Sequence, residues 1–167
     1  MRKLSVLFIV LCSLLFMCSS NELSKGAITA LKKLASKTEV GVSYNDYSAT
    51  LGDVNYEVNK FMESKEAKRN PELAKSISKV MDHYKTARQV WEMKFHYGTN
   101  GIIYLGSNNS KSPIDNMIAY ILKNYPEVAS TKVTSGKDEM LSLDVIISII
   151  WGAASRELKV AASLVSK

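Results

Sequence analysis

The turn at residues 41–47 gathers the residue types of this chain best suited to binding chemistry. A tyrosine offers an aromatic face and a hydroxyl together, so two tyrosines beside an amide and a carboxylate can form the rim of a site for a sugar, a peptide or a small polar ligand. The candidate ligand-binding residues are Tyr44, Asn45, Asp46, Tyr47 and, from a later segment, Tyr97. An alternative remains open, in which the tyrosines of the turn pack in a core while Ser43 and Asp46 cap a helix.

The two histidines of the chain provide a second, weaker set of candidates. Glu92 and His96 are four residues apart and share a helix face, where they could bind a metal or move a proton with help from another helix. His83 lies 13 positions before His96, which places the two imidazoles well apart around a helix axis. Salt bridging near a helix C-terminus explains the pair more simply, because a cationic imidazole is favourable there.

The common motifs of enzymes and cofactor sites are absent from the sequence. It contains no Glu-x-x-His pair for a di-iron bundle, no haem-attachment motif, no P-loop, no dinucleotide fingerprint, no zinc-protease motif and no nucleophile elbow. We therefore expect a non-enzymatic protein without a cofactor or a metal. The rival hypothesis is an enzyme that uses Asp46, or the Glu92 and His96 pair, as acid and base.

Residues 1–20 have the features of an export signal. Two basic residues precede an uncharged run at residues 4–18, which suits a signal-peptide core and is shorter than the roughly 20 residues of a membrane span. Cleavage after Ser20 would release a soluble domain. A second cleavage pattern competes with this one.

The residues around Cys18 resemble the lipobox of bacterial lipoproteins, in which the cysteine becomes the acylated first residue. Leu15-Phe16-Met17-Cys18 is followed by a polar tether, Ser19-Ser20-Asn21. Phe16 and Met17 depart from the family pattern, which prefers small residues before the cysteine. The resemblance implies lipidation at Cys18, a membrane partner through that anchor, and a place in the periplasm or on the outer face of a bacterial membrane.

The remaining chain, residues 21–167, is expected to fold as a single domain without covalent cross-links. Both cysteines, Cys12 and Cys18, lie in the leader, so this part has no internal disulfide. The full chain has 22 basic and 16 acidic residues, and the leader holds two of the basic ones, which leaves a net charge of +4. Basic residues are interleaved with acidic ones and no block of five or more like charges occurs, which argues against a nucleic-acid partner.

Apolar spacing and helix caps predict an all-α fold, an antiparallel bundle of about five helices. Steps of three and four residues draw two apolar stripes, which end at Phe61 and Trp91. Asn70-Pro71 and Ser112-Pro113 are typical of helix starts, and Ser43 and Ser135 each precede an aspartate by three residues, as in a capping box. The predicted helices cover residues 22–37, 44–64, 71–97, 113–124 and 138–166, and Gly41 is expected to stop the first.

Two further segments have distinct predictions. The uncharged run at residues 145–155 is apolar on nearly every side, which predicts the central, most buried helix of the bundle. Residues 98–111 are rich in glycine and asparagine and predict one long loop folded back onto the bundle.

These observations predict an exported cell-envelope lipoprotein that acts as a binding or scaffolding module for an envelope protein. The alternative is a soluble periplasmic bundle, similar to a sensor, that takes a small polar ligand between its helices. The residues do not predict an oligomeric state.

Overall fold

The computed structural model describes residues 21–96, 101–105, 113–136 and 138–165. The predicted leader, the lipidation site Cys18 and the rim candidate Tyr97 lie outside the described residues. The same holds for parts of the predicted loop at residues 98–111.

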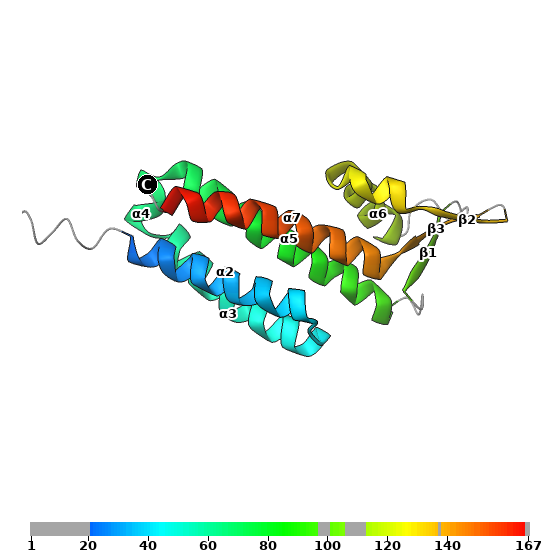
Figure 1. Cartoon of the computed structure of the whole chain (residues 1–167), viewed down its shortest axis with the longest axis horizontal. Coiled ribbons are helices and arrows are strands. Elements are labelled where there is room, and N and C mark those ends of the chain that lie inside the picture. The colour runs from blue at the N-terminus through cyan, green and yellow to red at the C-terminus, as the bar shows by residue number, and fades with distance from the viewer. Residues whose placement is uncertain (1–20, 97–100, 106–112, 137, 166–167) are drawn as a thin grey trace, which may run out of the picture.

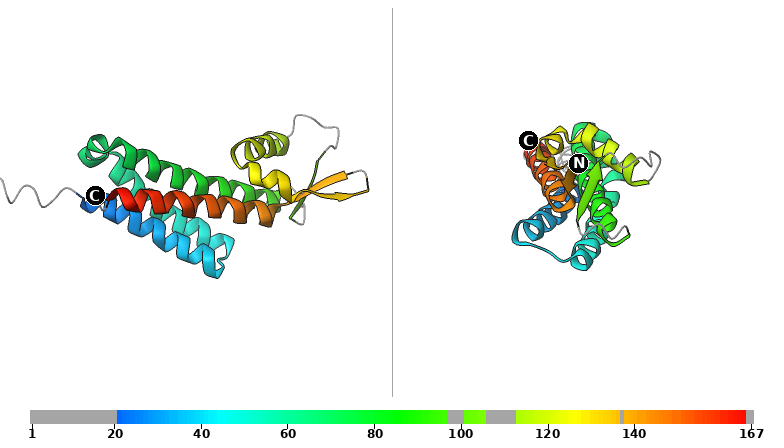
Figure 2. Two further views of the ribbon diagram at one scale, coloured as in Figure 1. Left: turned by 45° about the horizontal axis from the view of Figure 1, so that its top comes forward. Right: turned by 90° about the vertical axis from the view of Figure 1, so that its right-hand side faces the viewer.

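Four long helices form the body of the described chain. They are α2 (Glu22–Val40), α3 (Tyr44–Met62), α5 (Pro71–His96) and α7 (Leu143–Val165). Each packs on two others in the cyclic order α2, α3, α5, α7, and the end-on view of Figure 2 shows them around a common axis. Successive helices run in opposite directions (Figure 1). The prediction of an all-α antiparallel bundle is confirmed.

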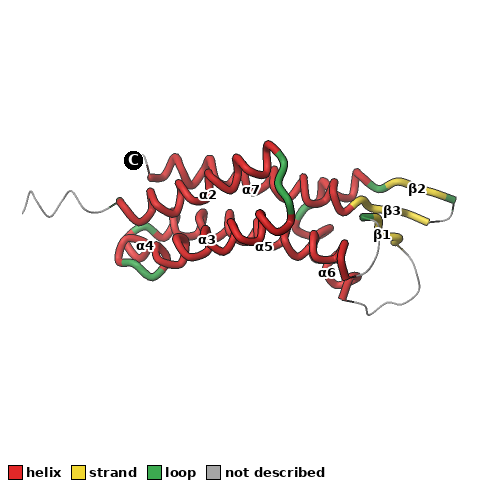
Figure 3. Tube along the Cα trace, turned by 90° about the horizontal axis from the view of Figure 1, so that it is seen from below, coloured by secondary structure: helices red, strands yellow, loops and turns green. Residues whose placement is uncertain are grey.

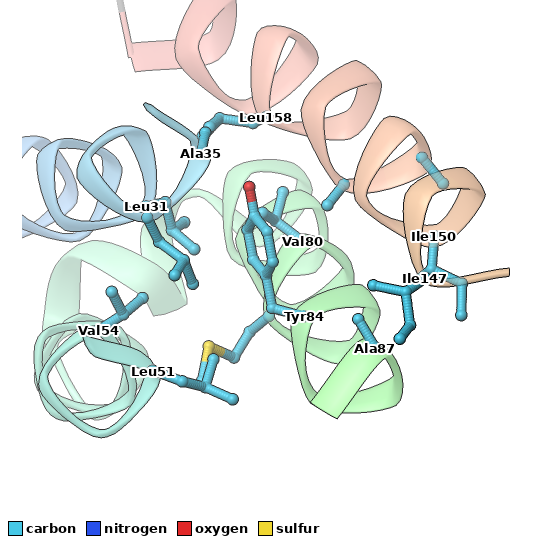
Figure 4. Packing of buried hydrophobic residues seen from close by; sticks show 14 of the residues in the cluster. Leu31, Ala35, Leu51, Val54, Val80, Tyr84, Ala87, Ile147, Ile150 and Leu158 are labelled. Carbon is cyan, nitrogen blue, oxygen red and sulfur yellow. The ribbon is translucent and has the colours of Figure 1, made fainter. Parts of the chain in front are cut away.

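The two predicted apolar stripes form the α3 and α5 sides of the core. Leu51 and Val54 on α3 face Val80 and Tyr84 on α5 in the close view of Figure 4, with residues of α2 and α7 closing the other two sides. Burial of this apolar surface is the main favourable contribution to folding, since the described chain contains no disulfide. The three largest fully buried side chains are Tyr47, Tyr84 and Phe61.

The predicted caps at Ser43 and Asn70 are both present. The Asp46 backbone amide donates to Ser43 Oγ over 3.1 Å at the start of α3, and the Leu73 amide donates to Asn70 Oδ1 over 3.2 Å at the start of α5. Gly41 follows α2 with φ of +93°, a left-handed conformation that favours glycine. A short helix, α4 (Lys65–Arg69), connects α3 to α5 where the sequence predicts only a polar connection.

The segment between α5 and α7 forms a separate tip at one end of the bundle. It contains β1 (Ile102–Leu105), α6 (Pro113–Asn124), the 3-10 helix η2 (Pro126–Thr131), β2 (Val133–Ser135) and β3 (Asp138–Ser142). The three strands form an antiparallel sheet in the order β1-β3-β2, which extends beyond the helices in Figure 3. One face covers the core through Ile103 and Leu141, while Tyr104 and Val133 on the other face are 57% and 60% exposed.

This sheet corrects two predictions. The last helix begins at Leu143 and not at Asp138, because residues 138–142 form β3 and pair with β1. Ser135 is therefore no helix cap, and it instead pairs with Asp138 across a turn in which Gly136 has φ of +65°. The predicted loop at residues 98–111 includes β1, whose pairing with a strand more than 30 residues later in the chain leaves no local pattern in the sequence.

The helix α7 occupies one corner of the bundle, so the prediction that it is central is wrong. It packs most extensively on α5 and next on α2, with Ile146, Ile147 and Ile150 buried against them and Val145 exposed. Within the described residues, no helix combines the length and apolar character needed to cross a bilayer.

Candidate functional site

The predicted turn at the start of α3 lies against the last turns of α5. This contact follows from the antiparallel arrangement, which brings the beginning of α3 beside the end of α5 (Figure 1). A shallow, open hollow of about 470 Å³ forms between them, and we call it the aromatic compartment. Its lining residues are Ser43, Tyr44 and Asn45 from the turn and Glu92, Phe95 and His96 from α5.

Tyr44 is the centre of this compartment. Its ring lies 5.0 Å from the Phe95 ring and 5.7 Å from the Trp91 ring, between centroids, and its hydroxyl donates to Glu92 Oε1 over 2.7 Å. Phe95 is 63% exposed, so one wall of the compartment is an aromatic ring open to solvent. The structure thus joins Tyr44, a predicted rim residue, to an exposed aromatic ring that the sequence did not predict.

Glu92 provides the negative charge of the compartment. Its Oε1 accepts from Arg88 Nε over 3.0 Å and from Arg88 Nη2 over 2.8 Å, in addition to the Tyr44 hydroxyl. Partial burial raises the pKa of Glu92, but the hydrogen bonds from Tyr44 and Arg88 and the charge of Arg88 outweigh burial, so that the pKa is lowered overall. The carboxylate is therefore ionised at neutral pH.

Tyr47 does not belong to the compartment, and this corrects the predicted rim. Its side chain is fully buried, and its hydroxyl donates to the backbone oxygen of Tyr84 over 2.8 Å and accepts from Trp151 Nε1 over 3.2 Å. Burial raises the pKa of Tyr47 strongly. Its ring contacts those of Trp91 and Trp151, with centroids 5.6 and 5.5 Å away, so Tyr47 is a core residue that joins α3, α5 and α7.

The remaining predicted rim residues have separate places. Asn45 and Asp46 are both exposed, but only Asn45 lines the compartment. Asp46 takes part in the helix cap, since its Oδ2 accepts a hydrogen bond from Ser43 Oγ over 2.6 Å. The capping alternative for Ser43 and Asp46 is thus confirmed. The second predicted pair, Glu92 and His96, does meet the predicted turn, and this could have been inferred from the antiparallel order of the two helices.

The other histidine, His83, lies outside this site. Its Nδ1 is 2.7 Å from the Tyr125 hydroxyl, in a contact between α5 and the residue that joins α6 to η2. Burial lowers the pKa of His83. Among the described residues, no group of three or more His, Cys, Asp or Glu side chains is placed to hold a metal ion.

The aromatic compartment is suited to contact with a ligand or partner at an open surface. Aromatic faces and carboxylates bind cationic and polar groups. The chain matches no protein-family model, and comparisons with curated proteins and with solved structures found no match.

Proposed function

We propose that this protein is exported, anchored to a bacterial membrane by lipid on Cys18, and acts as a non-enzymatic binding module in the cell envelope. The observation that carries this proposal is the position of Asn21, three residues after Cys18, relative to the aromatic compartment. Asn21 precedes α2 at the end of the bundle that also holds α4 and the end of α7 (Figure 1). The compartment lies at the opposite end of α3, a 19-residue helix about 28 Å long.

This placement suits a tethered binding protein. A lipid on Cys18 would hold the α4 end at the membrane and leave the aromatic compartment and the sheet further out, where an envelope protein can reach them. The carboxylate of Glu92, paired with Arg88, and the exposed ring of Phe95 offer a polar and an apolar contact side by side. The engagement of Glu92 by Tyr44 and Arg88 favours binding over catalysis, because a carboxylate with a lowered pKa is a poor general acid.

The anchor is tested by replacing each leader cysteine in turn in a bacterial host. We expect the wild-type protein and the Cys12→Ala control to sediment with membranes and to carry the added mass of acyl chains. Cys18→Ala should lose both properties, because no acylation site remains. A mature protein that begins at Asn21 without lipid mass would overturn the anchored form of the proposal.

The second candidate function is a soluble periplasmic protein that binds a small polar ligand. The aromatic compartment favours it, because about 470 Å³ can hold a small molecule against Tyr44 and Phe95. Such a ligand must raise the melting temperature, since it binds only the folded state. A screen of polar metabolites should then find a stabiliser whose effect is lost in Phe95→Ala and kept in Val160→Ala, a control with an exposed apolar side chain at the far end of α7.

A further inference from the structure

A pocket of about 480 Å³ lies at the end of the bundle where α2 begins, and we call it the α4 pocket. It forms where the short helix α4 meets the starts of α2 and α5 and the end of α7 (Figure 1). The residues on which its chemistry depends are Asn21 and Leu23 at the start of α2, Lys65 and Arg69 on α4, and Leu164 and Val165 at the end of α7.

The α4 pocket lies beside the residue that follows the proposed anchor segment. Asn21 is held against the first turn of α2, because its backbone oxygen accepts hydrogen bonds from Ser24 Oγ and from the Lys25 amide, both over 3.2 Å. Asn21 comes three positions after Cys18, and an extended chain spans at most about 11 Å over that length. A lipid on Cys18 would therefore keep the pocket within reach of the headgroups of the membrane.

Cations outnumber carboxylates in the lining of the pocket. Lys65 and Arg69 are exposed and lie four residues apart, on one face of α4. Neither forms a salt bridge within the part of the chain that the structure describes. Glu66 contributes one carboxylate, whose Oε2 accepts from the Ser24 amide over 3.4 Å and so ties α4 to the start of α2. The excess of positive charge suits an anionic ligand.

The α4 pocket also has an apolar side. Leu23, Leu164 and Val165 line it and are only partly buried against the core, so each keeps some accessible surface. Apolar surface beside unpaired cations matches the chemistry of a phospholipid, in which glycerol joins a charged phosphate to acyl chains. A small inorganic anion would leave these apolar side chains in contact with water.

From these observations we propose that the α4 pocket binds one anionic phospholipid of the membrane to which the chain is anchored. Lys65 and Arg69 pair with the phosphate group, while the glycerol and the first carbons of the acyl chains contact Leu23, Leu164 and Val165. The position of this site at a membrane rests on the proposed anchor, whereas the chemistry of the pocket does not depend on acylation of Cys18. The bound phospholipid is a second attachment, and two attachments hold a protein at a membrane more firmly than one.

The lipid site is tested by calorimetric titration of the purified Cys18→Ala protein with three soluble probes. Dihexanoyl phosphatidylglycerol supplies an anionic headgroup with short acyl chains, dihexanoyl phosphatidylcholine the same chains with a neutral headgroup, and glycerol 3-phosphate the anion without chains. We expect the first probe to bind about tenfold or more tightly than either of the others, because it alone meets both the cations and the apolar side.

Three results would overturn the proposal. Equal binding of the phosphatidylcholine would show that the cations have no part, and equal binding of glycerol 3-phosphate would identify the ligand as a free phosphate. Absence of phosphatidylglycerol binding below the concentration at which it forms micelles would leave no lipid site. Because the Cys18→Ala protein carries no acyl chain, failure here refutes the lipid site alone and leaves the anchor to its own test by sedimentation and mass.

Variants then locate the site. Lys65→Gln combined with Arg69→Gln should reduce the affinity for dihexanoyl phosphatidylglycerol about tenfold or more. Lys32→Gln combined with Lys33→Gln removes the same charge from exposed positions of α2 outside the pocket and should leave the affinity unchanged. Leu164→Asn should also weaken binding, because the acyl chains lose an apolar contact. Retention of tight binding in both the α4 double variant and Leu164→Asn would place the lipid elsewhere and refute the assignment.

Discussion

At the scale of single residues, Tyr47 places a hydrogen-bonded hydroxyl inside the core. Its hydroxyl bonds to the backbone oxygen of Tyr84 on α5 and to the indole of Trp151 on α7. A hydrogen bond between buried groups matters most through the cost of losing one partner, since the other is left unpaired. Tyr47 thus links α3, α5 and α7 by hydrogen bonds, which fix the relative position of the three helices more precisely than apolar packing alone.

Tyr47→Phe should therefore lower the free energy of unfolding by about 1–3 kcal/mol, because the Tyr84 carbonyl and the Trp151 indole both lose this partner. Urea denaturation followed by circular dichroism measures the change. Tyr56→Phe is the matched control on the same helix, since the Tyr56 side chain is 66% exposed. Equal losses in the two variants would contradict the role assigned to the Tyr47 hydroxyl.

Glu92 predicts a specific acid sensitivity. Its pKa in the folded state lies below the ordinary value of 4.5, so the unfolded state takes up the proton first. The stability from this carboxylate is fully present above pH 4.5 and is lost as the pH falls through the folded-state pKa. Between about pH 5 and pH 3, wild-type stability should fall more steeply than that of Glu92→Gln. Equal slopes in the wild type and in Glu92→Gln would contradict this role.

At the scale of elements, β3 is the segment whose local sequence misleads most. Residues 138–142 follow a serine-glycine turn and precede a long apolar helix. From the local sequence alone they are therefore predicted to be the first turn of that helix. In the structure Leu141 is 1% exposed and pairs with Ile103 of β1, while Met140 points to the other face. Adjacent residues on opposite faces are the property of a strand.

Leu141→Ala should consequently destabilise the protein by about 2–5 kcal/mol, as expected for removal of a buried leucine side chain. Met140→Ala should cost less than about 1 kcal/mol, because this neighbour lies on the half-exposed face of the sheet. Denaturant unfolding of the two variants gives both values. Similar losses at both positions would argue against the strand.

The attachment of α6 and η2 to α5 should depend on pH through His83. Burial lowers the pKa of His83 below 6.5, so protonation favours the unfolded state. The stability associated with the neutral imidazole is present above pH 6.5 and is lost as the pH falls below it. The melting temperature of the wild type should decrease from about pH 7 to pH 5, and His83→Gln should remove part of this decrease. An unchanged pH dependence in His83→Gln would contradict this role.

At the scale of the whole molecule, the structure has two different ends. One holds the start of α2, the helix α4 and the end of α7, and the other holds the sheet (Figure 2). Under the proposed anchor the first end faces the membrane. The aromatic compartment then lies on the side of the bundle away from the membrane, open to the envelope space.

This orientation is measurable with single labels, because both native cysteines lie in the leader. A fluorophore on Lys68→Cys in α4 should be quenched by a quencher carried on lipid headgroups when the anchored protein is reconstituted in vesicles. The same label on Thr134→Cys in β2 should be quenched much less, since it lies at the far end. Equal quenching at the two positions would contradict the orientation.

The sequence by itself determined the helical body of this protein and much of its candidate site. The stripes from Tyr44 to Phe61 and from Leu73 to Trp91, together with the caps at Ser43 and Asn70, are local signals that the structure confirms. These signals can be recognised in the sequence because a helix forms its hydrogen bonds within one segment. The residues of its buried face and of its N-terminal cap are therefore close together in the sequence.

Only the tertiary structure showed that the chain forms a sheet and which residues come together in the candidate site. The strand β1 pairs with β3, nearly 40 residues later, and Tyr44 meets Phe95 across two helices. Tyr47 and Tyr44 are alike in sequence context, yet one is fully buried and the other lines a surface hollow. Such outcomes depend on which distant segments pack together, because strand pairing and burial are contacts between segments and not properties of either one.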